Sequence, residues 1–166
     1  SLEEIRQRLL RSRLPLRSFD IVGERDRERP PWRMHLSVEG TAKQVEYLRR
    51  SIATLAREEA CRIDAPGSGT HSDDGANFVA RFATTPSTAV RDAGMLLARA
   101  NTIVDGARIL LECGGALLRL HATCTSREEF AALIQLCKER NEAGAGALLL
   151  EELPNEQKRD VDVWCG

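Results

Sequence analysis

The chain has 166 residues and a mass of 18.4 kDa, so it is long enough to bury a core without disulfides or a metal. Lysine and arginine total 24 against 25 for aspartate and glutamate, and aromatic residues are only 4%. This balance argues against a nucleic-acid binder, which needs a surplus of basic residues and aromatic side chains that stack on bases. No apolar stretch approaches the roughly 20 residues of a membrane span.

The first half of the sequence predicts helix, strand, strand, helix and short strand, over residues 2–13, 16–23, 32–39, 41–59 and 61–64. Leu2, Ile5 and Leu9 recur at helical spacing. Apolar and polar residues alternate cleanly over 32–39, which is typical of a half-buried strand. Thr41 and Gln44 have the spacing of a capping box, so a long amphipathic helix is expected to begin there.

The second half predicts strand, helix, strand, strand, helix and strand, over residues 77–83, 85–101, 107–113, 116–123, 126–141 and 147–153. This is the ferredoxin-like split βαβ order. Gly114-Gly115 suits a hairpin turn, and Ser126 with Glu129 forms another capping box. We therefore expect an α+β fold with an antiparallel or mixed sheet, helices on one face, and the other face left for a partner.

The cysteines and the most polar loop predict no metal site. The five cysteines are an odd, scattered set without a CxxC pair, which is typical of buried reduced thiols in a cytoplasmic protein. The segment 67–75 contains glycines and polar residues but no hydrophobic residue. We interpret His71, Asp73 and Asp74 as side chains of a solvated loop rather than as metal ligands.

Three predicted strands carry basic or polar side chains opposite their apolar residues, and these are Arg33 and His35, Asn77 and Arg81, and Arg119 and His121. If the strands are neighbours, these side chains share one face of the sheet. Guanidinium groups bind carboxylates through two hydrogen bonds, and histidine transfers protons near neutral pH. The competing interpretation is a solvent-facing surface, or a face that docks on another domain.

Three segments resemble a known family. The segment Leu36–Val45 resembles the strand–Glu–Gly–helix element of the C-terminal domain of FAD-linked oxidases. The tail 153–164 resembles the closing segment of the FAD-binding subunits of glycolate oxidase, with matches at Pro154, Lys158, Asp162, Val163 and Trp164, although Cys165 interrupts the usual Trp-Gly. The stretch 11–16 is similar to the step of those subunits into their first cap strand.

The resemblance implies the cap, or substrate, domain of vanillyl-alcohol-oxidase-type flavoproteins. In that family an N-terminal domain binds most of the FAD, and the sheet of the cap covers the isoalloxazine ring. We expect residues 1–166 to be a single cap-type domain, cut from a longer flavoprotein and inactive in isolation, because the chain opens on Ser1 and lacks an FAD domain. Its partners would be its own N-terminal FAD domain and other oxidase subunits.

The leading hypothesis is an FAD-dependent oxidoreductase that acts on a 2-hydroxy acid such as glycolate. Arg33, Arg81 or Arg119 would hold the substrate carboxylate, and His35 or His121 would take the hydroxyl proton. No catalytic residue of the family falls on a matched motif, so these roles come from strand alternation alone. The alternative is a non-catalytic ferredoxin-like binding or assembly module.

Overall fold

A computed structural model of the chain describes residues 2–12, 14, 16–24, 32–59, 75–112, 117–143, 148–154 and 164–165. The elements within them are α1 (Leu2–Arg11), β1 (Leu16–Glu24), β2 (Trp32–Val38), α2 (Ala42–Glu58), β3 (Phe78–Ala83), α3 (Ala89–Ala100), β4 (Arg108–Glu112), β5 (Leu117–Ala122), α4 (Arg127–Ala143), β6 (Leu148–Glu152) and β7 (Trp164–Cys165). Their order agrees with the sequence prediction. The predicted strand 61–64 lies outside the described residues, and the tail, predicted only as polar, contributes β7.

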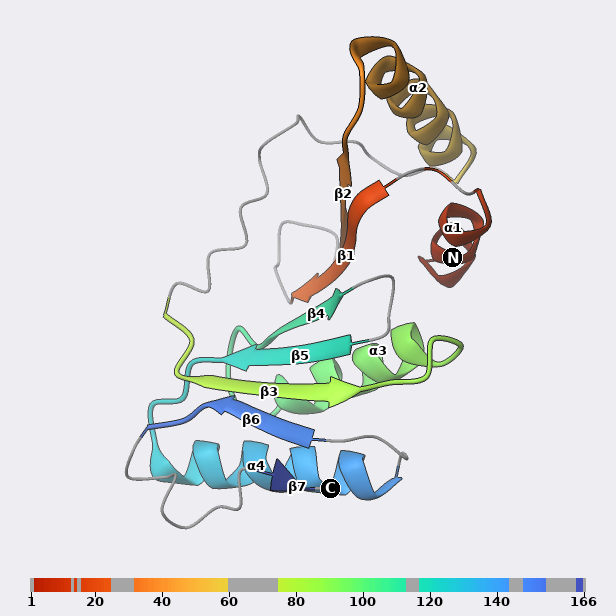
Figure 1. The fold of residues 1–166 in the computed structure, drawn as a ribbon. Helices are drawn as coiled ribbons and strands as arrows, with labels where there is room; N and C mark the ends of the chain where they lie inside the picture. Colours follow the sequence, from red (N-terminus) through yellow and green to blue (C-terminus); the bar gives the residue numbers. More distant parts are fainter. Residues whose placement is uncertain are drawn as a thin grey trace.

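The described strands form one sheet in the order β2-β1-β4-β5-β3-β6-β7, and every neighbouring pair is antiparallel (Figure 1). In the second half of the chain, β3 and β4 are joined through α3 but have β5 between them. In the same way, β5 and β6 are joined through α4 and have β3 between them. This is the split βαβ arrangement, and it confirms the predicted α+β fold with an antiparallel sheet.

Helices α3 and α4 pack against one face of the sheet and against each other. The inward side chains of the strands alternate with outward ones, so Phe78 and Leu120 are fully buried beneath the helices. Leu133 of α4 is also fully buried, as its helical spacing predicts. The rings of Phe78 and Phe130 lie 6.5 Å apart at 52°, a tilted arrangement that ties β3 to α4. No described helix has the length and hydropathy that crossing a membrane requires.

Helices α1 and α2 lie at the end of the sheet formed by β1 and β2 (Figure 1). Arg6 of α1 is completely buried, and its guanidinium forms two hydrogen bonds with the carboxylate of Glu3 at 2.9 and 2.7 Å. The same guanidinium donates to the carbonyl of Pro86, ahead of α3. Arg8 forms ion pairs with Glu58–Glu59 at the end of α2. Arginines therefore attach α1 to both of its neighbours.

Two helices begin at the capping boxes that the sequence predicts. The backbone N–H of Thr41 donates to Oε1 of Gln44 at 2.8 Å, while the Thr41 hydroxyl accepts from the N–H of Gln44. Ser126 and Glu129 make the equivalent pair of bonds at the start of α4. Leu48 of α2 is buried, as predicted. Each box satisfies N–H groups that a helix start otherwise leaves unpaired.

Candidate functional site on the polar face of the sheet

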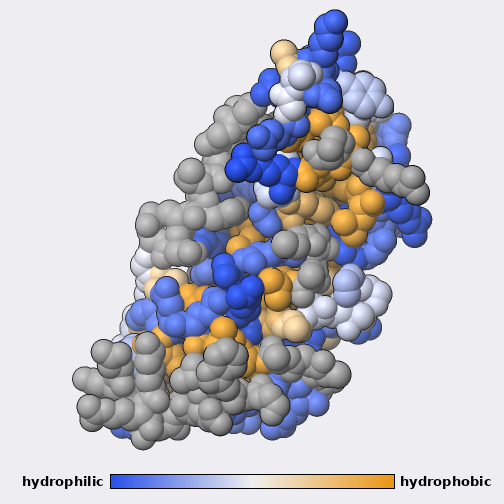
Figure 2. Space-filling view, in the orientation of Figure 1, coloured by the Kyte–Doolittle hydropathy of each residue, from blue (hydrophilic) through white to orange (hydrophobic). Residues whose placement is uncertain are grey.

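The sheet face opposite α3 and α4, here called the polar face, carries all five residues that the sequence proposes as site residues. Strand alternation places them there, because residues on either side of each in sequence point toward the helices. The sequence-proposed residues are Arg33 and His35 on β2, Arg81 on β3, and Arg119 and His121 on β5. Figure 2 shows hydrophilic residues over the middle of this face.

The topology divides these residues into two groups. Strands β3 and β5 are neighbours, so Arg81, Arg119 and His121 lie close together. Strand β2 is the first strand of the sheet, with β1 and β4 between it and β5. Three inter-strand steps of about 4.8 Å place β2 roughly 14 Å from β5. Arg33 and His35 therefore belong to a different site from the other three residues.

Arg119 and Arg81 take part in a chain of ion pairs that joins four strands. The guanidinium of Arg119 contacts Glu112 of β4 at 2.7 Å and Glu151 of β6 at 3.2 Å. Arg81 contacts the other carboxylate oxygen of Glu151 at 3.4 Å. We call Glu112, Arg119, Glu151 and Arg81 the ion-pair row. All four side chains are half-buried, and their formal charges cancel.

Sequence reasoning missed the two glutamates of this row, although a signal for them exists. Glu112 and Glu151 occupy outward positions at the ends of apolar strands, after Leu111 and Leu150. Counting outward acids as well as outward bases would have placed both glutamates on the polar face, although it would not have identified the arginines that they contact. Arg119 already contacts the carboxylates of these two glutamates. A substrate acid that binds Arg119 must therefore displace a carboxylate of the protein.

The two histidines differ in exposure. His121 is 4% exposed although it lies on the polar face, opposite Arg108 of β4 and Val79 of β3. His35 is half-buried and lies opposite Asp20 of β1. Burial is the main cause that lowers the pKa of His35 below its ordinary value, and the charge of nearby Arg33 lowers it further. His35 is therefore neutral at pH 7, which is the form that accepts a proton.

Two cysteines within the described residues carry no nucleophilic role. Cys124 and Cys137 are buried and reduced. Burial raises the pKa of the Cys124 thiol to about 11 and raises the pKa of Cys137 further. Thiols in this state are poor nucleophiles because the thiolate is the reactive form. In the same part of the chain, no group of three or more His, Cys, Asp or Glu side chains is arranged to hold a metal ion. The loop residues His71, Asp73 and Asp74 lie outside that part.

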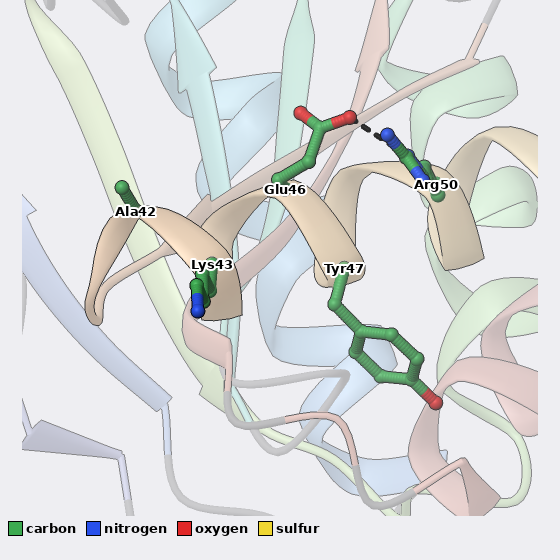
Figure 3. A pocket seen from close by; sticks show the side chains of 5 residues that line it. All are labelled: Ala42, Lys43, Glu46, Tyr47 and Arg50. Carbon is green, nitrogen blue, oxygen red and sulfur yellow. Dashed lines mark hydrogen bonds and ion pairs between the residues drawn. The ribbon is translucent and has the colours of Figure 1, made fainter.

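A shallow depression of about 390 Å³ lies away from the polar face, on helix α2 (Figure 3). Its lining residues are Ala42, Lys43, Glu46, Tyr47 and Arg50, which recur along one side of the helix. Glu46 and Arg50 are joined by an ion pair of 2.8 Å, and Tyr47 points away from it. A depression on one side of one helix offers no converging groups, so it is not a candidate active site.

The described residues do not fit FAD as a ligand held by this chain alone. The glycines with positive φ, Gly40, Gly75 and Gly106, lie in separate turns rather than in one phosphate-binding loop. The arginines of the ion-pair row are neutralised by glutamates. Within the described ranges, a pyrophosphate would therefore find no preformed cradle.

Comparison of the chain with models of known protein families, with curated proteins and with solved structures finds no match. The geometry of the polar face and the sequence resemblance are thus the grounds for assigning a function.

Proposed function

We propose that this chain is the cap domain of an FAD-dependent oxidoreductase that acts on a 2-hydroxy acid. The observation that carries the proposal is the sheet itself, covered by helices on one face and carrying arginines and histidines on the other. The segment that resembles FAD-linked oxidases supports it. That segment forms strand β2, a turn at Gly40 with φ of 153°, and helix α2, which is the strand–Glu–Gly–helix element of the resemblance.

Arg81 is the guanidinium best placed to take a substrate carboxylate. Its one ion pair among the described residues is the 3.4 Å contact with Glu151, whereas Arg119 is held at 2.7 and 3.2 Å by two glutamates. An incoming acid can replace Glu151 at Arg81 while that glutamate keeps its contact with Arg119. Arg119 then positions Glu151 rather than binding the substrate.

His121 is the proton acceptor that this geometry favours over His35. It lies two residues from Arg119 on the same strand, about 7 Å along the sheet, whereas β2 lies three strands away. Its burial keeps water from the imidazole, so the second domain would have to bring the substrate hydroxyl to it. The flavin would be held by that second domain, and no residue described here is assigned to it.

The test is the absorbance spectrum of the protein encoded by the complete gene. A flavin band that bleaches when glycolate or lactate is added without oxygen is the expected result. Arg81→Gln should then raise KM about tenfold or more, since a charge-assisted hydrogen bond contributes about 1.5–3 kcal/mol. Arg17→Gln, an exposed arginine on β1, is the matched control and should leave KM unchanged. A protein without flavin, or with flavin that no 2-hydroxy acid bleaches, contradicts the proposal.

One observation favours a second function, a non-catalytic binding or assembly module. The ion-pair row has no net charge, which suits a docking surface better than a site for an anionic substrate. One experiment on the same protein preparation distinguishes the two functions. A module would lack flavin and would elute with a partner subunit, and Glu151→Lys would release that partner by placing three cations together. A flavoenzyme would keep its flavin in the same variant.

A further inference from the structure

Strand β2 forms one edge of the described sheet, and it is the least well covered of the longer strands. None of its seven residues is buried, whereas Phe19 and Ile21 on the neighbouring β1 are 6% and 0% exposed. The residues of β2 that face the helices are apolar, namely Trp32, Met34, Leu36 and Val38. Apolar side chains also reach the surface where β1 and β2 meet α1 and α2 (Figure 2).

An edge strand of this kind is a template for pairing, because no strand of the described residues lies beside its outer backbone groups. Proteins that keep such an edge single usually place lysine, proline or an inward-pointing charge on it. Strand β2 has none of these, and its one charged residue, Arg33, lies on the polar face. Seven residues are also long enough for a stable ladder.

The charges near β2 are complementary to those of a second copy of the same strand. Arg33 is near the beginning of β2 and Glu39 follows its end, both on the polar face. If two copies of β2 pair antiparallel about Leu36, Arg33 of each copy lies opposite Glu39 of the other. The same register places Met34 opposite Val38 and Leu36 opposite its own equivalent. Polar side chains meet polar ones on one face, and apolar side chains meet on the other.

The ion pairs already present continue across this contact with alternating sign. Within one chain Arg17 contacts Glu39 at 3.1 Å, and Arg33 contacts Glu24 at 2.9 Å. Pairing about Leu36 therefore brings four charged side chains into one line of alternating sign. They are Arg17 and Glu39 of one copy, followed by Arg33 and Glu24 of the second copy. A register shifted by two residues would place Arg33 opposite Ser37 instead and lose this complementarity.

We propose that two copies of this chain associate through β2, antiparallel and centred on Leu36, to form one continuous sheet. The proposal is independent of the oxidoreductase function. In the dimer, the half-buried side chains of Met34, Leu36 and Val38 are covered by their counterparts. The polar faces of the two copies also lie on the same side of the joined sheet.

Light scattering after size-exclusion chromatography of the 166-residue chain tests the association. A dimer of about 37 kDa is expected, since one chain is 18.4 kDa. Glu39→Arg should weaken the dimer at least tenfold, because it places two cations opposite each other, and Arg33→Glu combined with Glu39→Arg should restore it. The matched control is Arg99→Glu, which breaks an exposed ion pair with Glu139 between α3 and α4 and should leave the dimer intact.

Single cysteines test the register, in a chain whose Cys61, Cys113 and Cys165 are replaced by serine. Directly opposed residues in an antiparallel pair have Cα atoms about 4.5–5.5 Å apart, within reach of a disulfide. Leu36→Cys should therefore give a cross-linked dimer on oxidation, whereas His35→Cys and Ser37→Cys should not. A monomer at micromolar concentration overturns the proposal, and so does cross-linking that is strongest at residue 35 or 37. Circular dichroism of each variant separates loss of the dimer from loss of the fold.

Discussion

Arg81 of β3 and Arg119 of β5 are direct cross-strand partners on the polar face of the sheet. Two like charges in this position destabilise a strand pair. Here one carboxylate, that of Glu151 on β6, contacts both guanidiniums through its two oxygens. The polar face is therefore held together by a bridging glutamate whose removal would leave two neighbouring cations.

Glu151→Gln is expected to lower the free energy of unfolding by about 1 kcal/mol, because the amide cannot offset the repulsion between Arg81 and Arg119. Urea denaturation measures the loss. The effect should shrink in 1 M NaCl, where the screening length falls to about 3 Å. Glu152→Gln, at the exposed adjacent position, is the control and should have almost no effect. Equal losses for the two variants would show that the bridge contributes nothing.

Arg6→Ala should lower the free energy of unfolding by about 2 kcal/mol, because it leaves the carbonyl of Pro86 without its buried donor. The loss should be local, since the guanidinium attaches α1 to the segment before α3. Amide hydrogen exchange measures it, with faster exchange expected in α1 and at Thr88. Arg11→Ala on the same helix is exposed and serves as the control. Unchanged exchange in α1 would contradict the anchoring role of Arg6.

Strand alternation, helical spacing and capping boxes predict the fold class and the order of the described elements from α1 to β6, but not β7. The box at Thr41 and Gln44 located the start of α2 because it depends on neighbours three residues apart. The pairing of Glu151 with Arg81 and Arg119 could not be predicted in this way. It depends on which strands are neighbours, and β6 and β5 lie on either side of β3 although they are separated by α4 in sequence.

The order of the strands also explains why Arg33 and His35 lie apart from Arg81, Arg119 and His121. The alternation of Arg33 and His35 with apolar residues correctly placed both on the polar face. It carries no information on the distance between strands, which is set by the order β2-β1-β4-β5. The burial of His121 was also beyond a local pattern, because an outward position on a strand ordinarily predicts exposure.

Gly23→Ala and Gly94→Ala should change the free energy of unfolding in opposite directions. Both glycines lie near the ring of Trp32, but only Gly23 is too close to it for a Cβ to fit. A Cβ on Gly23 would lie 2.5 Å from that ring, whereas a Cβ on Gly94 would lie 3.8 Å from it, an ordinary contact. The first substitution should cost about 1–3 kcal/mol through overpacking. The second should stabilise α3 by up to about 1 kcal/mol through helix propensity. Urea denaturation with tryptophan fluorescence measures both, and destabilisation of similar size in the two variants would refute the close approach of the Trp32 ring to Gly23.

His35 gives the stability of the protein a defined dependence on pH. Its pKa is lowered in the folded chain, chiefly by burial, so the unfolded chain binds a proton more readily. The stability that neutral His35 provides is therefore fully present above the unfolded pKa of about 6.5 and is lost as pH falls below it toward the folded pKa. The free energy of unfolding should accordingly decrease more between pH 7.5 and pH 5.5 in the native chain than in His35→Gln, which has no such proton to bind. The difference between the two chains isolates His35 from the other titrating groups, and the NMR titration of its ring protons should give a midpoint below 6.5. A midpoint above 6.5 would show that Asp20 and Glu24, which raise the pKa of His35, outweigh burial, and equal losses in both chains would show that they balance it.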